Sequence, residues 1–182
     1  MPGPEVAAAT TPAPPLSFEA FYLREYRRVV QLAYALSGSR TGAEDLAQEA
    51  FMAAHGRWAE IGQFEHPGAW VRKVAANLAS SAVRRRLAEG RALLRLAGRR
   101  EAAALGAMAE PDADFWRAVR ALPRRQAQAV ALFYLEDQSV ATIAQVLDCA
   151  EGTVKALLHQ CRRALAARLK LDDDLDTEEV SG

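Results

Sequence analysis

The stretch "SVATIAQVLDCAEGTVKALLHQCRRALAARL" (residues 139–169) contains two apolar stripes of helical spacing with a turn signal between them. The first predicted helix buries Val140, Ile143, Ala144 and Leu147, and the second buries Val154, Leu158, Cys161 and Leu165. Between them, "DCAEG" offers Asp148 or Gly152 to turn the backbone. Two short helices joined in this way predict a helix-turn-helix, whose second helix lies in the DNA major groove.

The other side of the second helix is cationic. It presents Lys155, His159, Arg162 and Arg163, with Thr153 at the start of the helix. Thr153 and Lys155 can reach phosphates, and Lys155 and His159 can reach base edges. A helical hairpin with a solvated basic face has the same pattern, so both interpretations are open. "EGTVK" favours DNA binding because it places a glycine, a hydroxyl and a base where the helix would meet the backbone.

The N-terminal half of the chain also has helical patterns. Ser17 can cap a first helix, and Thr41 with Glu44 forms a capping box that opens a second helix ending near Trp58. Pro67 is well placed in the first turn of a third helix. Ala, Leu, Arg and Glu are frequent, aromatic residues make up only 7%, and β-branched runs are scarce, which favours helices over strands.

We therefore predict an all-α protein of two small helical domains joined by a flexible linker, the second domain ending in the helix-turn-helix. The predicted order is a disordered arm (1–15), a first domain (16–86), a linker (87–112), a second domain (113–171) and an acidic tail (172–182). Helices are expected in the second domain from about Trp116 to Leu122 and from Pro123 to Leu135, before the helix-turn-helix.

The charge of the chain is unevenly distributed. The formal net charge is zero, with 23 basic and 23 acidic residues, which at first argues against a nucleic-acid partner. Six of the carboxylates lie in the last eleven residues, which contain no base, so the rest of the chain has 23 basic and 17 acidic residues, a net charge of +6. Because a terminal block of like charge is usually solvated, we expect the folded part to be basic.

Cysteine content and hydropathy indicate the compartment. Cys149 and Cys161 are the only cysteines and form no paired framework, so disulfides are not expected and a reducing cytoplasm fits. The first fifteen residues lack a signal-peptide pattern, and no apolar run approaches the ~20 residues that span a membrane. We expect a soluble protein.

Motifs for catalysis or metal binding do not emerge. There is no phosphate loop, no Ser-His-Asp order and no carboxylate pair in a plausible pocket. Cys149, His159 and Cys161 match no common zinc spacing and lack a fourth ligand. We predict no enzyme activity, no cofactor and no metal.

At this point the chain resembles a known family, the extracytoplasmic-function (ECF) sigma factors of bacterial RNA polymerase. The resemblance covers about residues 16–170 and rests on three segments in order. They are "AEDLAQEAF" (43–51), "AWVRKVAANLASSAVRRR" (69–86) and "ALPRRQAQAVALFYLEDQSVATIAQVLDCAEGTVKALLHQCRRAL" (121–165). The resemblance implies a subunit that binds core RNA polymerase, recognises the minus-10 and minus-35 promoter elements and helps to open the minus-10 segment.

The resemblance also implies roles for residues of the first domain. Asp45, Gln48, Glu49 and Met52, which share one helix face, would dock on the basic clamp helices of core polymerase; a solvated acidic face has the same pattern. Phe64, Lys73, Asn77, Ser80, Arg84 and Arg85 would bind the minus-10 element, with Phe64 in the loop that lines a pocket for a flipped base. Trp70 matches an aromatic position that could pack in the core or lie near the melted strand, and core packing is favoured.

In the second domain the resemblance assigns minus-35 binding to Thr153, Lys155, His159, Arg162 and Arg163. Ala150 stands where the family usually has a serine cap, and Thr142 replaces the common Glu of the preceding capping box. Family members commonly have an anti-sigma partner, which is plausible here. Two alternatives are a stand-alone helix-turn-helix regulator, which would bind duplex DNA without polymerase, and a helical adaptor for an acidic protein.

Overall fold

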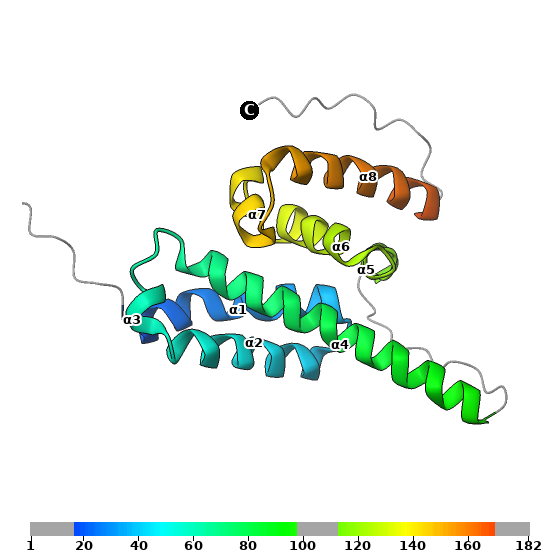
Figure 1. The fold of residues 1–182 in the computed structure, drawn as a ribbon, viewed down its shortest axis with the longest axis horizontal. Coiled ribbons are helices and arrows are strands. Elements are labelled where there is room, and N and C mark those ends of the chain that lie inside the picture. Colours follow the sequence, from blue (N-terminus) through cyan, green and yellow to red (C-terminus); the bar gives the residue numbers. More distant parts are fainter. Residues whose placement is uncertain (1–16, 98–112, 170–182) are drawn as a thin grey trace, which may run out of the picture.

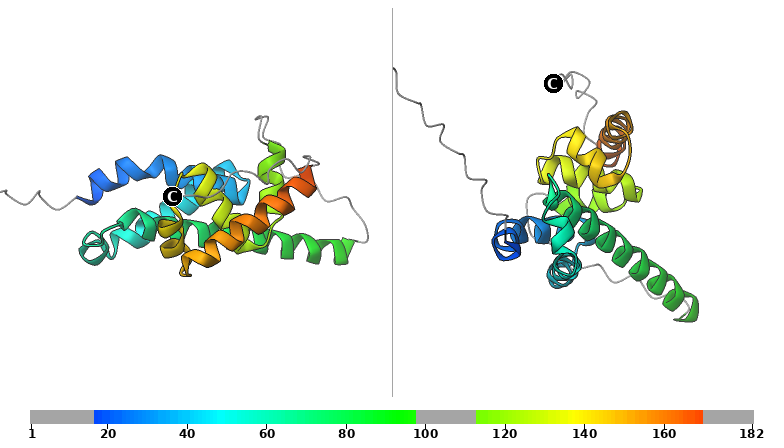
Figure 2. Two further views of the ribbon diagram at one scale, coloured as in Figure 1. Left: turned by 90° about the horizontal axis from the view of Figure 1, so that it is seen from above. Right: turned by 60° about the vertical axis from the view of Figure 1, so that its left-hand side comes forward.

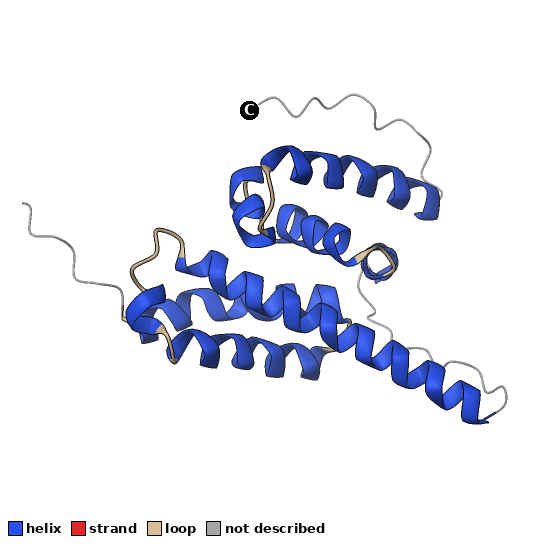
Figure 3. Cartoon of the chain, in the orientation of Figure 1, coloured by secondary structure: helices blue, strands red, loops and turns tan. Residues whose placement is uncertain are grey.

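A computed structural model describes residues 17–97 and 113–169 of the chain. Every regular element within these two ranges is a helix, as predicted (Figure 3). The helices fall into two groups, α1–α4 and α5–α8, which we call the N-terminal and the C-terminal bundle (Figure 1). No helix of the described residues is long and apolar enough to cross a membrane.

The N-terminal bundle packs three long helices and one short helix around an aromatic core. Its elements are α1 (Phe18–Ser37), α2 (Arg40–His55), α3 (Trp58–Ile61) and α4 (Pro67–Ala97). Phe21 is fully buried and lies 5.9 Å from Phe51 and 4.8 Å from Trp58, ring centre to ring centre. Pro67 lies in the first turn of α4, as predicted, and the helix continues to Ala97, beyond the predicted boundary between the first domain and the linker at residues 86 and 87.

The cap of α2 differs from the prediction. Ser17 caps α1 as expected, since its hydroxyl accepts a hydrogen bond from the backbone N–H of Ala20. Helix α2, however, is capped by Ser39, whose hydroxyl accepts from the N–H of Gly42, and not by Thr41. The reason is the turn before it: Gly38 has a φ of 70° and ends α1, so the chain re-enters a helix two residues earlier than the capping-box pattern indicated.

The C-terminal bundle contains the predicted helix-turn-helix. Its elements are α5 (Ala113–Arg120), α6 (Arg124–Val130), the π-helical turn η1 (Ala131–Leu135), α7 (Val140–Leu147) and α8 (Glu151–Leu169). Helix α8 buries Val154, Leu158, Cys161 and Leu165, which confirms the predicted stripe. Of the stripe predicted for α7, Ile143, Ala144 and Leu147 are buried, whereas Val140 is only partly buried.

The turn between α7 and α8 uses Asp148 and not Gly152 as its hinge. Asp148 has a φ of 54° and ψ of 61°, a left-handed conformation, whereas Gly152 lies inside α8. Asp tolerates this conformation better than most residues. Ser139 caps α7, and its hydroxyl lies 2.9 Å from the hydroxyl of Thr142, so Thr142 takes part in the cap.

The two bundles lie against each other (Figure 2). Leu32 and Leu36 of α1 and Ala76 and Ala79 of α4 belong to the same buried apolar cluster as the core of the C-terminal bundle. The two helical bundles are thus in contact with each other through this shared cluster. The DNA- and polymerase-binding candidates must therefore be located relative to a closed, two-bundle arrangement.

Candidate nucleic-acid and polymerase interface

Helix α2 presents the predicted polymerase-binding residues on one open surface. Asp45, Gln48 and Glu49 are exposed, and Met52 is 74% exposed. We call these four residues the α2 surface. Figure 1 shows α2 on the side of the molecule away from α5–α8, so the C-terminal bundle leaves this surface uncovered. An exposed methionine next to charged side chains is typical of a protein-binding surface, since Met adapts to a partner and a large exposed apolar group favours burial.

The α4 residues predicted to bind the minus-10 element are not open to solvent in the same way. Lys73, Asn77 and Ser80 lie on successive turns of α4 and are all half-buried. We call these three residues the α4 face. The Gln128 amide nitrogen, from α6, lies 3.3 Å from Asn77 Oδ1 and 3.2 Å from Ser80 Oγ. Arg124 of α6 also donates to Asn77 Oδ1.

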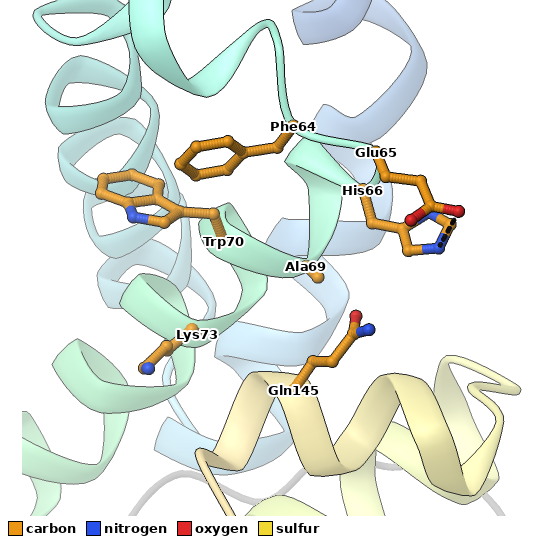
Figure 4. Close-up of a pocket in the computed structure, with 7 residues that line it drawn as sticks. All are labelled: Phe64, Glu65, His66, Ala69, Trp70, Lys73 and Gln145. Atoms are coloured by element: carbon orange, nitrogen blue, oxygen red, sulfur yellow. Dashed lines mark ion pairs between the residues drawn. The ribbon is translucent and has the colours of Figure 1, made fainter.

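A pocket of about 380 Å³ lies next to Lys73 (Figure 4). The loop before α4 contributes Phe64, which is 40% exposed, and α4 contributes Trp70. Figure 4 shows these two rings next to each other, with Gln145 of α7 projecting toward the pocket from the C-terminal bundle. Two aromatic rings beside a lysine can stack a base and neutralise its phosphate.

Trp70 belongs both to the core of the N-terminal bundle and to the wall of the pocket. It packs against the aromatic core of the N-terminal bundle, as predicted, and also lines the pocket. The Arg57 guanidinium lies 5.6 Å from the centre of the Trp70 ring and is held by Glu60 through contacts of 2.8 and 2.9 Å. The guanidinium thus lies over the face of the indole ring.

A basic segment of α4 lies farther along the helix, at residues 84–86. Arg84 and Arg85 are exposed. Arg84 donates to the hydroxyl of Ser81 at 3.2 Å, while Arg86 is half-buried and points to the carbonyl of Ser37 at 3.5 Å. Arg84 and Arg85 are thus available for phosphate contacts, and Arg86 contributes to packing.

Helix α8 lies on the side of the C-terminal bundle that faces away from α1–α4 (Figure 1). Thr153, Lys155, His159 and Arg163 are exposed, as a DNA-contacting helix requires. Arg162 differs from the prediction because it is half-buried and its Nε atom is fully buried without a hydrogen-bond partner among the described residues. The cationic face is therefore formed mainly by Lys155, His159 and Arg163.

Sequence analysis missed a buried ion cluster between the bundles. Arg72 of α4 is 5% exposed and contacts Glu25 Oε2 of α1 at 2.8 Å and Glu136 Oε2, which follows η1, at 2.9 Å. Burial raises the pKa of Glu136, and the charges of Arg72 and Arg28 oppose this effect. The sequence contained one indication of this cluster: Glu25 is a carboxylate four residues from both Phe21 and Val29, on the buried side of α1.

The cysteines are not arranged for metal binding. Cys161 is buried, its sulfur lies 3.6 Å from the carbonyl oxygen of Gln126, and burial raises the pKa of its thiol to about 11. Cys149 is partly buried and also free. In the part of the chain that the structure describes, no three His, Cys, Asp or Glu residues come together as metal ligands.

Comparison with known proteins places this architecture in one family. The sequence profile of sigma-70 region 2 matches residues 21–89, and that of sigma-70 region 4 matches residues 112–165. The ECF RNA polymerase sigma factor SigM of Mycobacterium tuberculosis is 31% identical over 180 residues, which cover 95% of this chain and 86% of SigM. SigW of Bacillus subtilis, another ECF sigma factor, is 25% identical over 156 residues, which cover 79% of this chain and 83% of SigW.

A solved structure agrees with these relatives. The sigma factor RpoE of Bartonella quintana, in complex with the anti-sigma factor NepR, superposes with a TM-score of 0.68 at 25% sequence identity, covering 85% of this chain and 98% of RpoE. The two sigma regions follow each other in the order that the two helical bundles have here. The chain therefore belongs to the ECF sigma factors of bacterial RNA polymerase, alternative sigma factors that direct the polymerase to promoters and initiate transcription there.

Proposed function

We propose that the α2 surface is the site at which this sigma factor binds core RNA polymerase. The observation that carries this assignment is the exposed Met52 next to Asp45 and Glu49, neither of which forms an ion pair with another described residue. A basic partner surface would pair with both carboxylates and bury the methionine. The clamp helices of core polymerase, implied by the family resemblance, have this character.

Promoter binding is divided between the two bundles in this proposal. The α4 face, the pocket at Phe64 and the exposed Arg84 and Arg85 bind the opened minus-10 strand, whereas α8 binds the minus-35 duplex. Lys155 and His159 are exposed on α8, which supports base contacts in the major groove. Two weak DNA-binding modules on one chain raise each other's local concentration, so that a pair of elements is recognised better than either alone. Residues 16–86 and 113–171 are the proposed modules, with 87–112 as the linker.

The proposed partners and location follow from this function. RpoE, the structural relative, was solved with an anti-sigma factor, and we expect a protein of that class to bind this chain as well. Catalysis of RNA synthesis remains with the polymerase, and no cofactor is needed by the chain itself. Because polymerase and promoter DNA are in the bacterial cytoplasm, we propose that the chain acts there.

The test of the docking assignment is co-purification with core polymerase. We expect Asp45→Arg to abolish binding because it places a cation against a basic partner, a change that costs roughly 2–5 kcal/mol at an interface. Glu89→Arg, the same charge reversal on the exposed side of α4, should bind as the wild type does. Unchanged co-purification of Asp45→Arg would reject the α2 surface as the docking site.

The test of the promoter assignment is transcription by reconstituted holoenzyme. Core polymerase with the wild-type chain should start transcripts at specific sites on genomic DNA, and sequencing their 5′ ends should show two shared elements upstream. Core polymerase alone should not start at these sites. Duplex binding by the isolated chain, with no dependence on core polymerase, would instead support a stand-alone regulator.

A further inference from the structure

Helix α8 has an excess of positive charge that no described residue neutralises. Its only carboxylate is that of Glu151 in the first turn, whereas Lys155, Arg162, Arg163 and Arg168 are cations. None of these four forms an ion pair with another residue in the described ranges. Lys155 and Arg163 are exposed and lie eight residues apart on one side of the helix, about 12 Å along its axis. We call this side, which also carries His159, the cationic side of α8.

The chain contains a segment of opposite charge directly after α8. The acidic tail, residues 172–182, lies outside the described residues. It has no base and six carboxylates, those of Asp172, Asp173, Asp174, Asp176, Glu178 and Glu179. It begins three residues after Leu169, the last residue of α8. Because a short connection holds the tail near the helix, its effective concentration there is in the millimolar range at any protein concentration.

The tail is long enough to reach the whole cationic side of α8. The helix has 19 residues and is therefore about 28 Å long. Residues 170–182 can span about 45 Å when extended. Lys155 lies about 21 Å from Leu169 along the helix axis, and Glu178 follows Leu169 by nine residues, which can span about 30 Å. Helix α8 also lies on the outer side of the C-terminal bundle, so the other helices leave room beside it (Figure 1).

We propose that the acidic tail binds back along the cationic side of α8 and occupies the positions that phosphates of duplex DNA would take there. Carboxylates and phosphates are both anions that accept hydrogen bonds from the same lysine and arginine donors. The tail therefore competes with phosphates and lowers the affinity of the free chain for duplex DNA of any sequence. The competition rests on the proposed minus-35 role of α8, whereas the contact between tail and helix does not.

Two double variants that remove equal charge separate tail docking from the overall charge of the chain. Arg163→Ala/Arg168→Ala removes two exposed cations of α8. Arg27→Ala/Arg40→Ala is the matched control, because it removes two exposed cations of α1 and α2 that belong to none of the proposed interfaces. A third variant, the tail-neutral chain, has Asn for each Asp and Gln for each Glu of the tail and keeps its length. Circular dichroism of each variant checks that helix content is retained.

Zero-length carbodiimide cross-linking of the free full-length chain detects the contact. The sequence has three lysines, Lys73, Lys155 and Lys170. An isopeptide between Lys155 and a carboxylate of the tail is therefore readily assigned by peptide mass spectrometry. Lys73 Nζ lies 3.8 Å from Asp148 Oδ2, and the product of this pair is the internal standard of the reaction. A mixture of isotope-labelled and unlabelled chains distinguishes a contact within one chain from a contact between two copies.

The yield of the Lys155–tail product relative to the standard should follow the charge of α8. We expect the product within one chain in the wild type, with an equal yield in Arg27→Ala/Arg40→Ala. Arg163→Ala/Arg168→Ala should lower the yield about threefold or more, because it removes two of the cations that pair with the tail.

Binding of duplex DNA tests the competition. The probe is a labelled random-sequence duplex of about 20 base pairs, followed by fluorescence anisotropy in about 0.1 M salt, where charges more than about 10 Å apart are largely screened. The tail-neutral chain should bind about tenfold more tightly than the wild type. This gain should stay near tenfold in the Arg27→Ala/Arg40→Ala background. It should fall to about threefold or less in Arg163→Ala/Arg168→Ala, because the tail has fewer cations to occupy.

Three results would overturn the inference. The first is that no Lys155–tail product forms within one chain although the standard forms, and a product found only between labelled and unlabelled chains would place the tail on a second copy. The second is an equal yield in the two double variants. The third is an equal gain in DNA affinity in their two backgrounds, which would make the tail a general negative charge. None of these results changes the co-purification of Asp45→Arg or the start sites of holoenzyme, so a failure of this inference is distinguishable from a failure of the proposed function.

Discussion

Replacing Arg72 by methionine should lower the free energy of unfolding by about 3–5 kcal/mol at neutral pH. The Arg72 side chain is 6% exposed and contacts carboxylates that are 10% and 1% exposed, those of Glu25 and Glu136. Methionine retains most of the packing of the arginine stem but leaves Glu136 without its ion-pair partner and Glu25 with only the exposed Arg24. Removing one partner of a buried ion pair costs this amount because the remaining charge is neither hydrated nor paired.

Arg24→Met is the matched control for this prediction. Arg24 contacts the same carboxylate, that of Glu25, at 2.9 Å, but its side chain is 57% exposed. An exposed ion pair contributes about 0–1 kcal/mol, so this variant should remain close to the wild type. Urea denaturation followed by far-ultraviolet circular dichroism measures both free energies. If Arg72→Met fell within about 1 kcal/mol of Arg24→Met, the cluster would be solvated and the reasoning refuted.

A second-site change separates charge from packing in the same assay. Glu136→Gln in the Arg72→Met background removes the buried carboxylate that has lost its partner and should restore part of the lost stability. Acidification should act in the same direction, because buried carboxyls without a cation bind protons more readily in the folded chain than in the unfolded one. If the stability lost in Arg72→Met changed neither with pH nor with Glu136→Gln, the loss would result from packing and not from charge.

Three further outcomes follow from the geometry. Burial raises the folded-state pKa of Glu136 above 4.5. The stability of the wild type should therefore increase relative to that of Glu136→Gln as pH falls from neutral toward 4.5, and this advantage should be lost as pH rises through the folded pKa. Urea denaturation at several pH values measures the difference. With its thiol pKa raised to about 11, Cys161 should be alkylated by iodoacetamide at pH 8 at least about tenfold more slowly than Cys149, and equal rates in the native chain would contradict its burial. Lys155→Ala should reduce the preference of holoenzyme for an intact over a scrambled minus-35 element, measured as the ratio of transcription from the two templates. Arg168→Ala removes the same charge at the far end of α8 and should leave this ratio unchanged. An equal loss of transcription on both templates would mean that Lys155 contacts only phosphates.

Local patterns were sufficient for the helical class and for the buried faces of most helices, but not for every helix boundary. The buried stripe of α8 follows from apolar spacing alone, because a helix of this periodicity has only one face that can enter a core. The cap of α2 was predicted wrongly at Thr41 because Ser39 and Thr41 are both acceptable caps in sequence. The left-handed turn at Gly38 selects Ser39, and that turn is a property of the folded chain.

The sequence also predicted those candidate interface residues that lie together on a single helix. The α2 surface and the exposed side of α8 are each a set of residues three or four apart, so helix geometry alone brings their members together. Arg162 was assigned to the DNA face on this basis, but its half-buried position depends on neighbouring helices. The pocket next to Phe64 required the structure, since Gln145 enters it from the other bundle.

By itself the sequence determined an all-helical chain with a helix-turn-helix, a helix with a polar side and a helix with a basic side, because each is a periodic feature within a single helix. The tertiary structure alone decided that Arg72 pairs with Glu136, 64 residues away, and that Gln128 covers Asn77. Such contacts depend on how two preformed helical surfaces dock, and a single sequence contains no periodicity that relates one surface to the other. The physical reason is that helix formation is governed by local spacing and capping, whereas docking is governed by complementary burial and charge between distant segments.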